Sequence, residues 1–256
     1  GIQLYTLRNQ IDQDVTATLQ AVADAGYQQV EMYGFPDCQP MIKASRDAGL
    51  AMHSSHFAWN SVVNPDDAGV PPFAEILDKA HDTGLTHLVI PYLEDRNRKN
   101  LDDYRQLAER SNKAAEQAKQ AGIQLAYHNH AFEFKPMSGG KTGYDVLIEE
   151  FSPDMHFEVD VFWIKIGGKD PVKLIRQLTG RVSQLHLKDL NDATTIPSYD
   201  GVPNEAFEEL GDGNIPMEPI IEVAAEAGVK HCHVEQDQSP DPLASIRQSM
   251  AYLKSL

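Results

Sequence analysis

Four strand-like runs from residue 123 onward carry imidazole, carboxylate or ammonium side chains at or near their carboxyl ends. They are IQLAYHNH (123–130), MHFEVDVFW (155–163), VSQLHLKD (182–189) and KHCHVEQD (230–237). Successive side chains of a strand point to opposite faces, so the alternation within each run assigns its polar residues to one face. That face carries His128 and His130, Glu158 and Asp160, Gln184, His186 and Lys188, and finally His231, His233 and Glu235.

The carboxyl ends of these runs offer ligands for a divalent cation. The groups are His128 or His130, Asp160, His186 and Glu235, with Glu133 just past the first run. Carboxylates and imidazoles bind Mn²⁺, Mg²⁺, Co²⁺ or Zn²⁺. Burying them without a partner would be costly, and a divalent ion is the simplest partner. The pattern therefore predicts a metal site where these strands end.

Each of these residues, taken alone, has a simpler interpretation. A single inward-facing Asp or His is more often a hydrogen-bonded structural group than a ligand. His128 and His130 could form only a polar strand end, and His231 and His233 could fill the interior of a barrel. Four such groups at one level on consecutive strands are much harder to obtain by accident, which favours a shared site.

Glycine residues mark the ends of the helices that precede the strands carrying these residues. Six Ala-Gly or Thr-Gly pairs each close a helical stretch, and a strand-like run follows each of them. Glycine adopts the left-handed conformation that ends many helices. The six are Gly26, Gly49, Gly84, Gly122, Gly180 and Gly228. They introduce the strands 28–34, 50–57, 86–92, 123–130, 182–189 and 230–237. With the runs 2–6 and 155–163 we expect eight strands.

Helical stretches alternate with these strands along the whole chain. They are expected at 14–25, 37–48, 71–83, 100–121, 142–151, 170–179, 216–227 and 240–254. This alternation, with no break in composition, predicts a single α/β domain over residues 1–256, a closed (β/α)8 TIM barrel. An open doubly wound sheet is the alternative, but the GxGxxG turn expected there is absent. The long connection 191–215 is expected at the active-site face.

Bulk composition excludes several classes of function. The net charge of −16 opposes binding to nucleic acid, but it allows a neutral sugar or a divalent cation. Cys38 and Cys232 lie far apart and indicate neither a disulfide framework nor a Cys-type zinc site. No stretch is long enough to span a membrane. We expect a cytoplasmic protein, or a periplasmic or secreted one if a signal peptide has been removed.

Several segments resemble one known family. The chain is similar to the sugar phosphate isomerase/epimerase branch of the xylose-isomerase-like barrel superfamily. The resemblance lies in GIQLYTLR (1–8), YHNHAFEF (127–134), EVDVFW (158–163), HLKD (186–189), LGDGN (210–214) and HVEQ (233–236). These segments span nearly the whole chain. The resemblance implies one divalent metal, with Mn²⁺ as the first expectation, held by Glu, Asp, His and Glu from strands five to eight.

The implied ligand set matches this chain at three of its four positions. Asp160, His186 and Glu235 correspond to the last three ligands. Many relatives place the first Glu within the fifth strand, where this chain has Tyr127 and His128. Glu133 is therefore the expected fourth ligand, with His128 or His130 as the alternative.

The reaction that the resemblance implies is proton abstraction beside a carbonyl of a keto sugar or related polyol. A metal polarises the oxygens and stabilises the enediolate, while a general base and acid move the proton. Glu133, Glu235, His128 and His130 are the candidates for proton transfer. Substrate contacts are expected from Lys188, Trp163, Glu31, His56 and Tyr5.

Some of these substrate contacts have alternatives. Lys188 could instead pair with Glu158 or Asp160, and Trp163 and Tyr5 could simply pack as large aromatics. Glu31 could touch a sugar hydroxyl or support another residue. His53 and His56 fall on opposite faces of their strand, and the alternation does not decide which of them faces inward.

The leading prediction is a metal-dependent isomerase or epimerase. β-Elimination from a 3-keto-glycoside and dehydration of a keto-inositol share its first step and are the alternatives. A non-catalytic sugar-binding barrel and an endonuclease are the other classes, and the acidic charge disfavours the endonuclease. No glycine-rich phosphate loop with nearby basic residues marks a phosphate site. The sequence does not indicate an oligomeric state.

Overall fold

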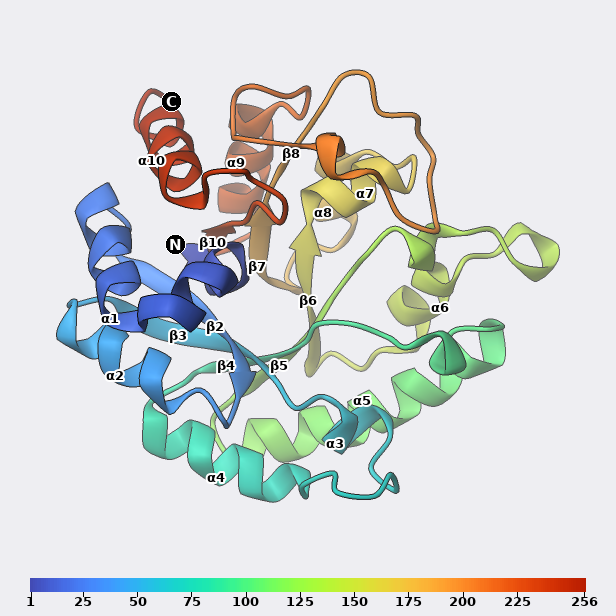
Figure 1. Ribbon diagram of the computed structural model, residues 1–256. Coiled ribbons are helices and arrows are strands. Elements are labelled where there is room, and N and C mark those ends of the chain that lie inside the picture. The colour runs from blue at the N-terminus through green and yellow to red at the C-terminus, as the bar shows by residue number, and fades with distance from the viewer.

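A closed barrel of parallel strands forms the centre of the molecule in the computed structural model, which describes residues 1–256 (Figure 1). The strands pair in the order β1-β10-β7-β6-β5-β4-β3-β2, so first and last close the barrel. Their bounds are β1 Ile2–Gln3, β2 Gln29–Phe35, β3 Ala51–Phe57, β4 His87–Ile90, β5 Gln124–His128, β6 Met155–Asp160, β7 Val182–Leu187 and β10 His231–Val234. The predicted barrel is confirmed.

Helices surround the barrel on its outside (Figure 1). Those between or after barrel strands are α1 Arg8–Ala25, α2 Gln39–Asp47, α4 Phe73–Thr83, α5 Leu101–Gln120, α6 Gly143–Glu150, α8 Pro171–Gln177, α9 Met217–Glu226 and α10 Pro242–Leu253. Each overlaps a predicted helical stretch. Two short helices were not predicted, α3 Asn60–Val63 and α7 Val161–Ile166. No helix combines the length and the apolar composition needed to cross a membrane.

All six punctuating glycines have positive φ angles, as the helix-stop interpretation requires. Gly84, for example, has φ 85° and ends α4 by donating its backbone N–H to carbonyls of the last turn. A residue with a Cβ would be strained in this conformation. These stops fix where the following strands begin.

The first strand is shorter than predicted. The run 2–6 was expected to be extended, but only Ile2 and Gln3 are, and a 3-10 turn occupies Leu4–Leu7. The Gln3 side chain accepts a hydrogen bond from the backbone N–H of Tyr5 (3.1 Å), which favours the turn over extended chain. Helix α1 then begins at Arg8 instead of residue 14, with a kink at Asp14.

The sixth strand also ends earlier than the predicted 155–163. It stops at Asp160, whose Oδ1 accepts a hydrogen bond from the backbone N–H of Trp163 (3.0 Å) and so caps α7. A capping Asp satisfies a donor that a helix start leaves free. The aromatic residues of the run therefore belong to a helix at the mouth of the barrel.

The connection 191–215 lies at the carboxyl end of the barrel, as predicted. It holds strand β9 (Phe207–Glu208), which pairs antiparallel with β8 (Asp189–Leu190). The carboxylate of Asp189 accepts hydrogen bonds from the backbone N–H groups of Gly211, Gly213 and Ile215 at 2.9–3.2 Å. One buried carboxylate thus holds the LGDGN turn and anchors the connection beside the site.

The apolar core lies mainly between the strands and the helices, where 63 buried residues form one cluster. The outward-facing residues of the barrel strands, such as Phe157, Val159 and Leu185, belong to it. The inward-facing side chains are mostly polar and fully buried, among them Glu31, Glu158 and Gln184. Because buried polar groups must find partners, these residues form the networks described below.

Candidate active site

A cavity of about 610 Å³ opens at the carboxyl ends of the barrel strands. We call it the central cavity. Its wall includes polar side chains from the strand ends and aromatic side chains from the loops, among them His56, His128, His130, Trp163, Lys188 and Glu235. Residues 201, 202, 204 and 207 of the long connection also border it. Its size is typical of sites for small ligands.

Four buried side chains gather beside this cavity and form the outer cluster: His128, Asp160, His186 and Glu235. One ligand atom of each lies within 4.8 Å of the others. They come from β5, β6 and β7 and from the residue after β10, and the register pairs Asp160 directly with His186. The strand alternation thus brings together side chains that lie 107 positions apart in the sequence, from 128 to 235.

Lys188 lies among the carboxylates of the outer cluster. Its Nζ is 3.1 Å from Asp160, 2.7 Å from Glu235 and 3.0 Å from Asp237. The ring of His186, shared with a second cluster described below, also contacts Glu235 (2.8 Å), yet the three carboxylates still outnumber the cationic groups beside them, which leaves negative charge in excess. Burial opposes ionisation of Asp160, but Lys188 and His128 outweigh it and lower the pKa of Asp160 to about 2.

The donor set fits a divalent cation. Two imidazoles and two carboxylates converge from four chain segments, which is a mixed nitrogen and oxygen set that Mn²⁺, Co²⁺ and Zn²⁺ accept. The excess of carboxylate over ammonium gives the second, independent reason. A divalent ion would offset charge that Lys188 alone does not.

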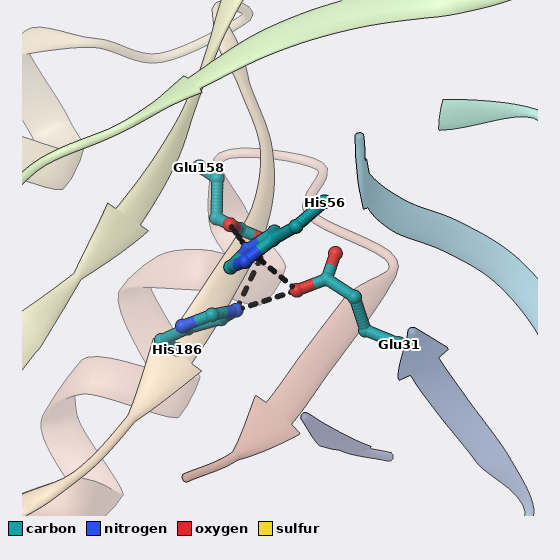
Figure 2. Close-up of side chains that lie close together, drawn as sticks. All are labelled: Glu31, His56, Glu158 and His186. Carbon is teal, nitrogen blue, oxygen red and sulfur yellow. Dashed lines mark hydrogen bonds and ion pairs between the residues drawn. The ribbon is translucent and has the colours of Figure 1, made fainter. Parts of the chain in front are cut away.

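A second group of four lies next to the first and shares His186. Figure 2 shows the four side chains of this second group. This inner cluster consists of Glu31, His56, Glu158 and His186. Nε2 of His186 lies 2.7 Å from Glu31 and 3.2 Å from Glu158, and Nε2 of His56 lies 3.3 Å and 3.2 Å from the same two carboxylates. Two carboxylates are thus bridged by two imidazoles.

Neutral donors complete the inner cluster. Glu31 accepts hydrogen bonds from the amides of Gln3 (2.7 Å) and Gln184 (2.6 Å) and from the hydroxyl of Ser54. Gln184 also donates to Glu158. Each carboxylate therefore has an internal set of partners, and an added metal ion is not needed to satisfy it.

The charges of the inner cluster balance each other. Burial lowers the pKa of His56, but Glu31 and Glu158 outweigh burial and raise it to about 9. For His186 burial acts in the same direction, and Glu158 and Glu235 raise its pKa well above its ordinary value. Two imidazolium groups therefore lie between the two carboxylates and stabilise the inner cluster.

Glu133, the expected fourth metal ligand, lies outside the outer cluster. Its carboxylate accepts hydrogen bonds from the hydroxyl of Tyr127 (2.6 Å) and from the backbone N–H of His130 (2.9 Å). Burial raises its pKa to about 7. It sits in the 3-10 turn Phe132–Phe134 after β5. The structure brings His128, the alternative, to that place in the cluster instead.

The other predicted residues divide between the cavity wall and the interior. Tyr5, His56, His130, Trp163 and Lys188 all border the central cavity. Tyr5 is 44% exposed and lies at the rim, where the guanidinium of Arg8 stacks on its ring. Glu31 is fully buried, and its carboxylate lies 2.7 Å from Nε2 of His186.

Both histidines of β3 contact inward-facing side chains, although alternation had placed them on opposite faces. Val30 pairs with Met52 but Glu31 pairs with Ser54, so His53 is an extra residue in the register. This bulge turns the ring of His53 onto His231 (4.7 Å between centroids), while His56 stacks on His186 (5.6 Å). The expectation that only one of them faces inward is wrong.

Sequence reasoning missed several polar partners. Asp237 contacts Lys188 and borders the cavity, and its position at the end of the run 230–237 could have marked it. Gln3 and Ser54 complete the inner cluster, but they look like ordinary strand residues. Tyr92 and Trp59, which also line the cavity, follow strands and carry no signal of their own.

Comparison with known proteins agrees with this fold. A family model described as a xylose isomerase-like TIM barrel matches residues 19–256. A solved structure of a sugar phosphate isomerase/epimerase from Parabacteroides distasonis has a TM-score of 0.80 and 24% identity, and covers 100% of this chain and 97% of that chain. Another solved structure, the IolI protein with a bound zinc atom, has a TM-score of 0.72 and 13% identity, over 99% and 96% of the two chains.

A curated relative from Clostridium perfringens is named inosose dehydratase. It is 26% identical over 167 residues, which are 60% of this chain and 55% of the relative. The chain thus spans little more than half the length of that relative. The relatives include both an isomerase/epimerase and a dehydratase by name, in line with the two kinds of enzyme expected from the sequence.

Proposed function

The chain belongs to the xylose isomerase-like TIM barrel family, and from this premise we propose that it is a divalent-metal-dependent enzyme acting on a small sugar or polyol. The reaction begins with removal of a proton beside a carbonyl group. The observation that carries the proposal is the outer cluster, a mixed imidazole and carboxylate set with excess negative charge at the wall of a 610 Å³ cavity.

His128, Asp160, His186 and Glu235 would hold the metal. His128 takes the first position in this proposal because Glu133 is already bonded to Tyr127 and His130. When bound, the ion supplies Lewis-acid polarisation of the substrate's oxygens. Mn²⁺ is our first candidate, and the zinc atom of the IolI structure makes Zn²⁺ the second.

The protein's own side chains would move the proton. His130 borders the cavity and is held in place by the hydrogen bond from its backbone N–H to Glu133. Burial, together with the nearby His128 and Lys188, lowers the pKa of His130 well below its ordinary value, so its imidazole is neutral and offers a free ring nitrogen to accept the proton. Lys188 lies on the same wall as a charged donor for a substrate oxygen, with Asp237 and Glu235 fixing its position. Trp163 offers an apolar surface for the sugar ring.

Two outcomes of the first step remain candidates. Returning the proton to another carbon or face gives an isomerase or epimerase, the function named for the Parabacteroides protein. Loss of a hydroxyl or alkoxide from the neighbouring carbon gives a lyase, the class named for the Clostridium relative. Both need the same metal set and the same base.

Exchange of substrate protons with deuterated water tests the common step. The purified chain, loaded with Mn²⁺ or Zn²⁺, is incubated with a panel of ketoses, keto-inositols and 3-keto-glycosides, and deuterium incorporation is followed by NMR. We expect metal-dependent exchange at a carbon beside the carbonyl. Recovery of an isomer supports epimerisation, and an unsaturated product supports elimination. Metal-loaded protein that exchanges no member of the panel contradicts the proposal.

A further inference from the structure

A second cavity of about 460 Å³ adjoins the central cavity. We call it the side cavity. The two share Tyr92, His130, Trp163 and Gly201 in their walls, so they are neighbouring parts of one cleft. The side cavity alone is large enough for a small ligand. No residue of the outer cluster lines it.

Aromatic rings form much of the wall between the two cavities. Phe132 and His130 are stacked nearly parallel, at 6° and 5.4 Å between centroids. Tyr92 stands perpendicular to both, and Trp163 lies 5.2 Å from His130. The guanidinium of Arg98 lies 3.6 Å from the centre of Phe132, which holds that ring in place. Rigid aromatic walls of this kind favour a flat or ring-shaped ligand.

The charged residues of the side cavity are paired with one another. Arg98 forms an ion pair with Asp95, and Nζ of Lys135 lies 3.0 Å from Asp200. All four residues line the cavity. Two cations are thus matched by two carboxylates, and no surplus positive charge is left for a phosphate or carboxylate group. The charge pattern favours a neutral ligand.

We propose that the side cavity binds a neutral ring attached to the reacting sugar, so that the substrate is a glycoside with a sugar or aryl substituent. The reacting ring occupies the central cavity at the outer cluster, and its substituent passes His130 and Trp163 into the side cavity. The inference rests on the proposed function for the placement of the reacting ring. It distinguishes a glycoside from a free monosaccharide and from a sugar phosphate.

Unreactive ligands test this inference without turnover. Binding of methyl and phenyl glycosides of glucose, galactose and mannose, and of the three 6-phosphates, is measured by calorimetry or saturation-transfer NMR with the full chain. For at least one sugar we expect the phenyl glycoside to bind about tenfold more tightly than the methyl glycoside, since an aromatic contact and burial of the ring together supply about 1.4 kcal/mol. The phosphates should gain nothing over the methyl glycosides.

Blocking variants assign the preference to the side cavity. Met137 lines this cavity and not the central one, so Met137→Trp should abolish the phenyl preference while Met137→Leu keeps it. If Met137→Trp fails to fold, Lys135→Trp provides a second block, because that side chain is 48% exposed. A phenyl preference that survives both blocks, or no preference with any sugar, overturns the inference.

The outcome is separable from that of the proposed function. Proton exchange with no phenyl preference removes only the side-cavity assignment. If the blocking variants abolish the phenyl preference but the protein exchanges no substrate protons, the side cavity stands as a binding site and the proposed reaction is contradicted.

Discussion

The inner and outer clusters contain the same kinds of side chain and share His186, yet they differ in how their charges are satisfied. In the inner cluster, Glu31 and Glu158 are met by two imidazoles and by amide and hydroxyl donors. In the outer cluster, Asp160 and Glu235 share one lysine with Asp237 and lie at the wall of a cavity. The inner cluster is complete within the protein, whereas the outer cluster has capacity for a further cation.

This difference shows that residue type alone does not mark a metal site. A buried carboxylate beside a histidine is stable when neighbouring donors fill its remaining lone pairs. A carboxylate can instead bind a metal ion or a substrate where it has fewer such donors and lies at the wall of a cavity. His186 links the two situations, because one edge of its ring faces Glu31 and the other faces Glu235 (2.8 Å).

Loss of an outer carboxylate should have the largest effect on activity. Asp160→Ala removes a proposed ligand, and Asp160→Asn removes its charge while an amide oxygen still caps α7 as Oδ1 does now. We expect both variants to lose bound metal and to lower proton exchange by about 10⁴-fold, since a metal contributes several kcal/mol to the transition state. Metal content by atomic emission and exchange by NMR measure the two effects.

Asp154→Ala is the matched control for this prediction. Asp154 precedes the same strand at its opposite end and pairs with Lys119 at the surface. It should keep full metal content. Normal metal content in both Asp160 variants would refute the outer cluster as the site.

Loss of an inner carboxylate should act first on stability. Glu31→Gln breaks a buried ionic network by removing one partner, which costs about 3–5 kcal/mol in the free energy of unfolding. Because Glu31 also orients His186, metal affinity should fall about 10- to 100-fold without being abolished. Urea unfolding and metal titration measure both. The same change at the exposed Glu109, which pairs with Lys113, should leave the free energy of unfolding nearly unchanged.

If Glu31→Gln removed the metal as completely as Asp160→Ala while leaving stability unchanged, the distinction between the clusters would be lost. The inner cluster would then have to be counted as part of the metal site.

The outer cluster was predictable from the sequence because it depends on alternation within long strands. Asp160 and His186 face inward for the same reason that Phe157 and Leu185 face outward, and the register places them side by side. Glu133 follows its strand in a turn, where alternation no longer applies. Its direction depends on hydrogen bonds to Tyr127 and His130 that only the folded turn reveals.

Local irregularities account for most of the other differences from prediction. The bulge at His53 changes the face of the strand to which this side chain points, and nothing in the sequence AMHSSHF predicts it. Gln3 ends the first strand because its side chain bonds to the backbone two residues on. Asp160 ends the sixth strand by capping a helix. In each case a side-chain to backbone bond or a register shift overrides strand propensity.

Because of the inner cluster, the free energy of unfolding should also depend on pH in the alkaline range. The pKa of His56 is about 9 in the folded protein against 6.5 for the ordinary side chain. A raised pKa means that the folded state binds the proton more tightly, so this stabilisation is complete below pH 6.5 and is lost as pH rises through about 9. The loss amounts to about 3 kcal/mol at most. Glu31 and Glu158 face this ring from β2 and β6, and the rings of His128 and His186 lie beside it.

Urea unfolding between pH 6.5 and 9.5 measures this effect as the difference between the wild type and His56→Gln. That difference removes the contributions of all other titrating groups, which the wild type and the variant share. The wild type should lose its advantage over the variant as pH rises. His81→Gln, at an exposed histidine, should show no such dependence. An advantage constant with pH would mean that His56 is neutral in the folded protein and that the inner cluster is not charge-balanced.

The smallest effect is expected at the rim, away from both clusters. Tyr5 borders the central cavity but is 44% exposed, and its ring contacts Tyr33 and Arg8 instead of any cluster residue. Tyr5→Ala should raise KM for a substrate found by the exchange assay by about fivefold, because one aromatic contact contributes about 1 kcal/mol. Tyr5→Phe retains the ring and should keep KM near the wild-type value. Metal content should not change in either variant, since Tyr5 contacts no residue of the outer cluster. Loss of metal in Tyr5→Ala would show that the cavity rim and the outer cluster are coupled. The metal site would then have to include residues of the rim as well as the outer cluster.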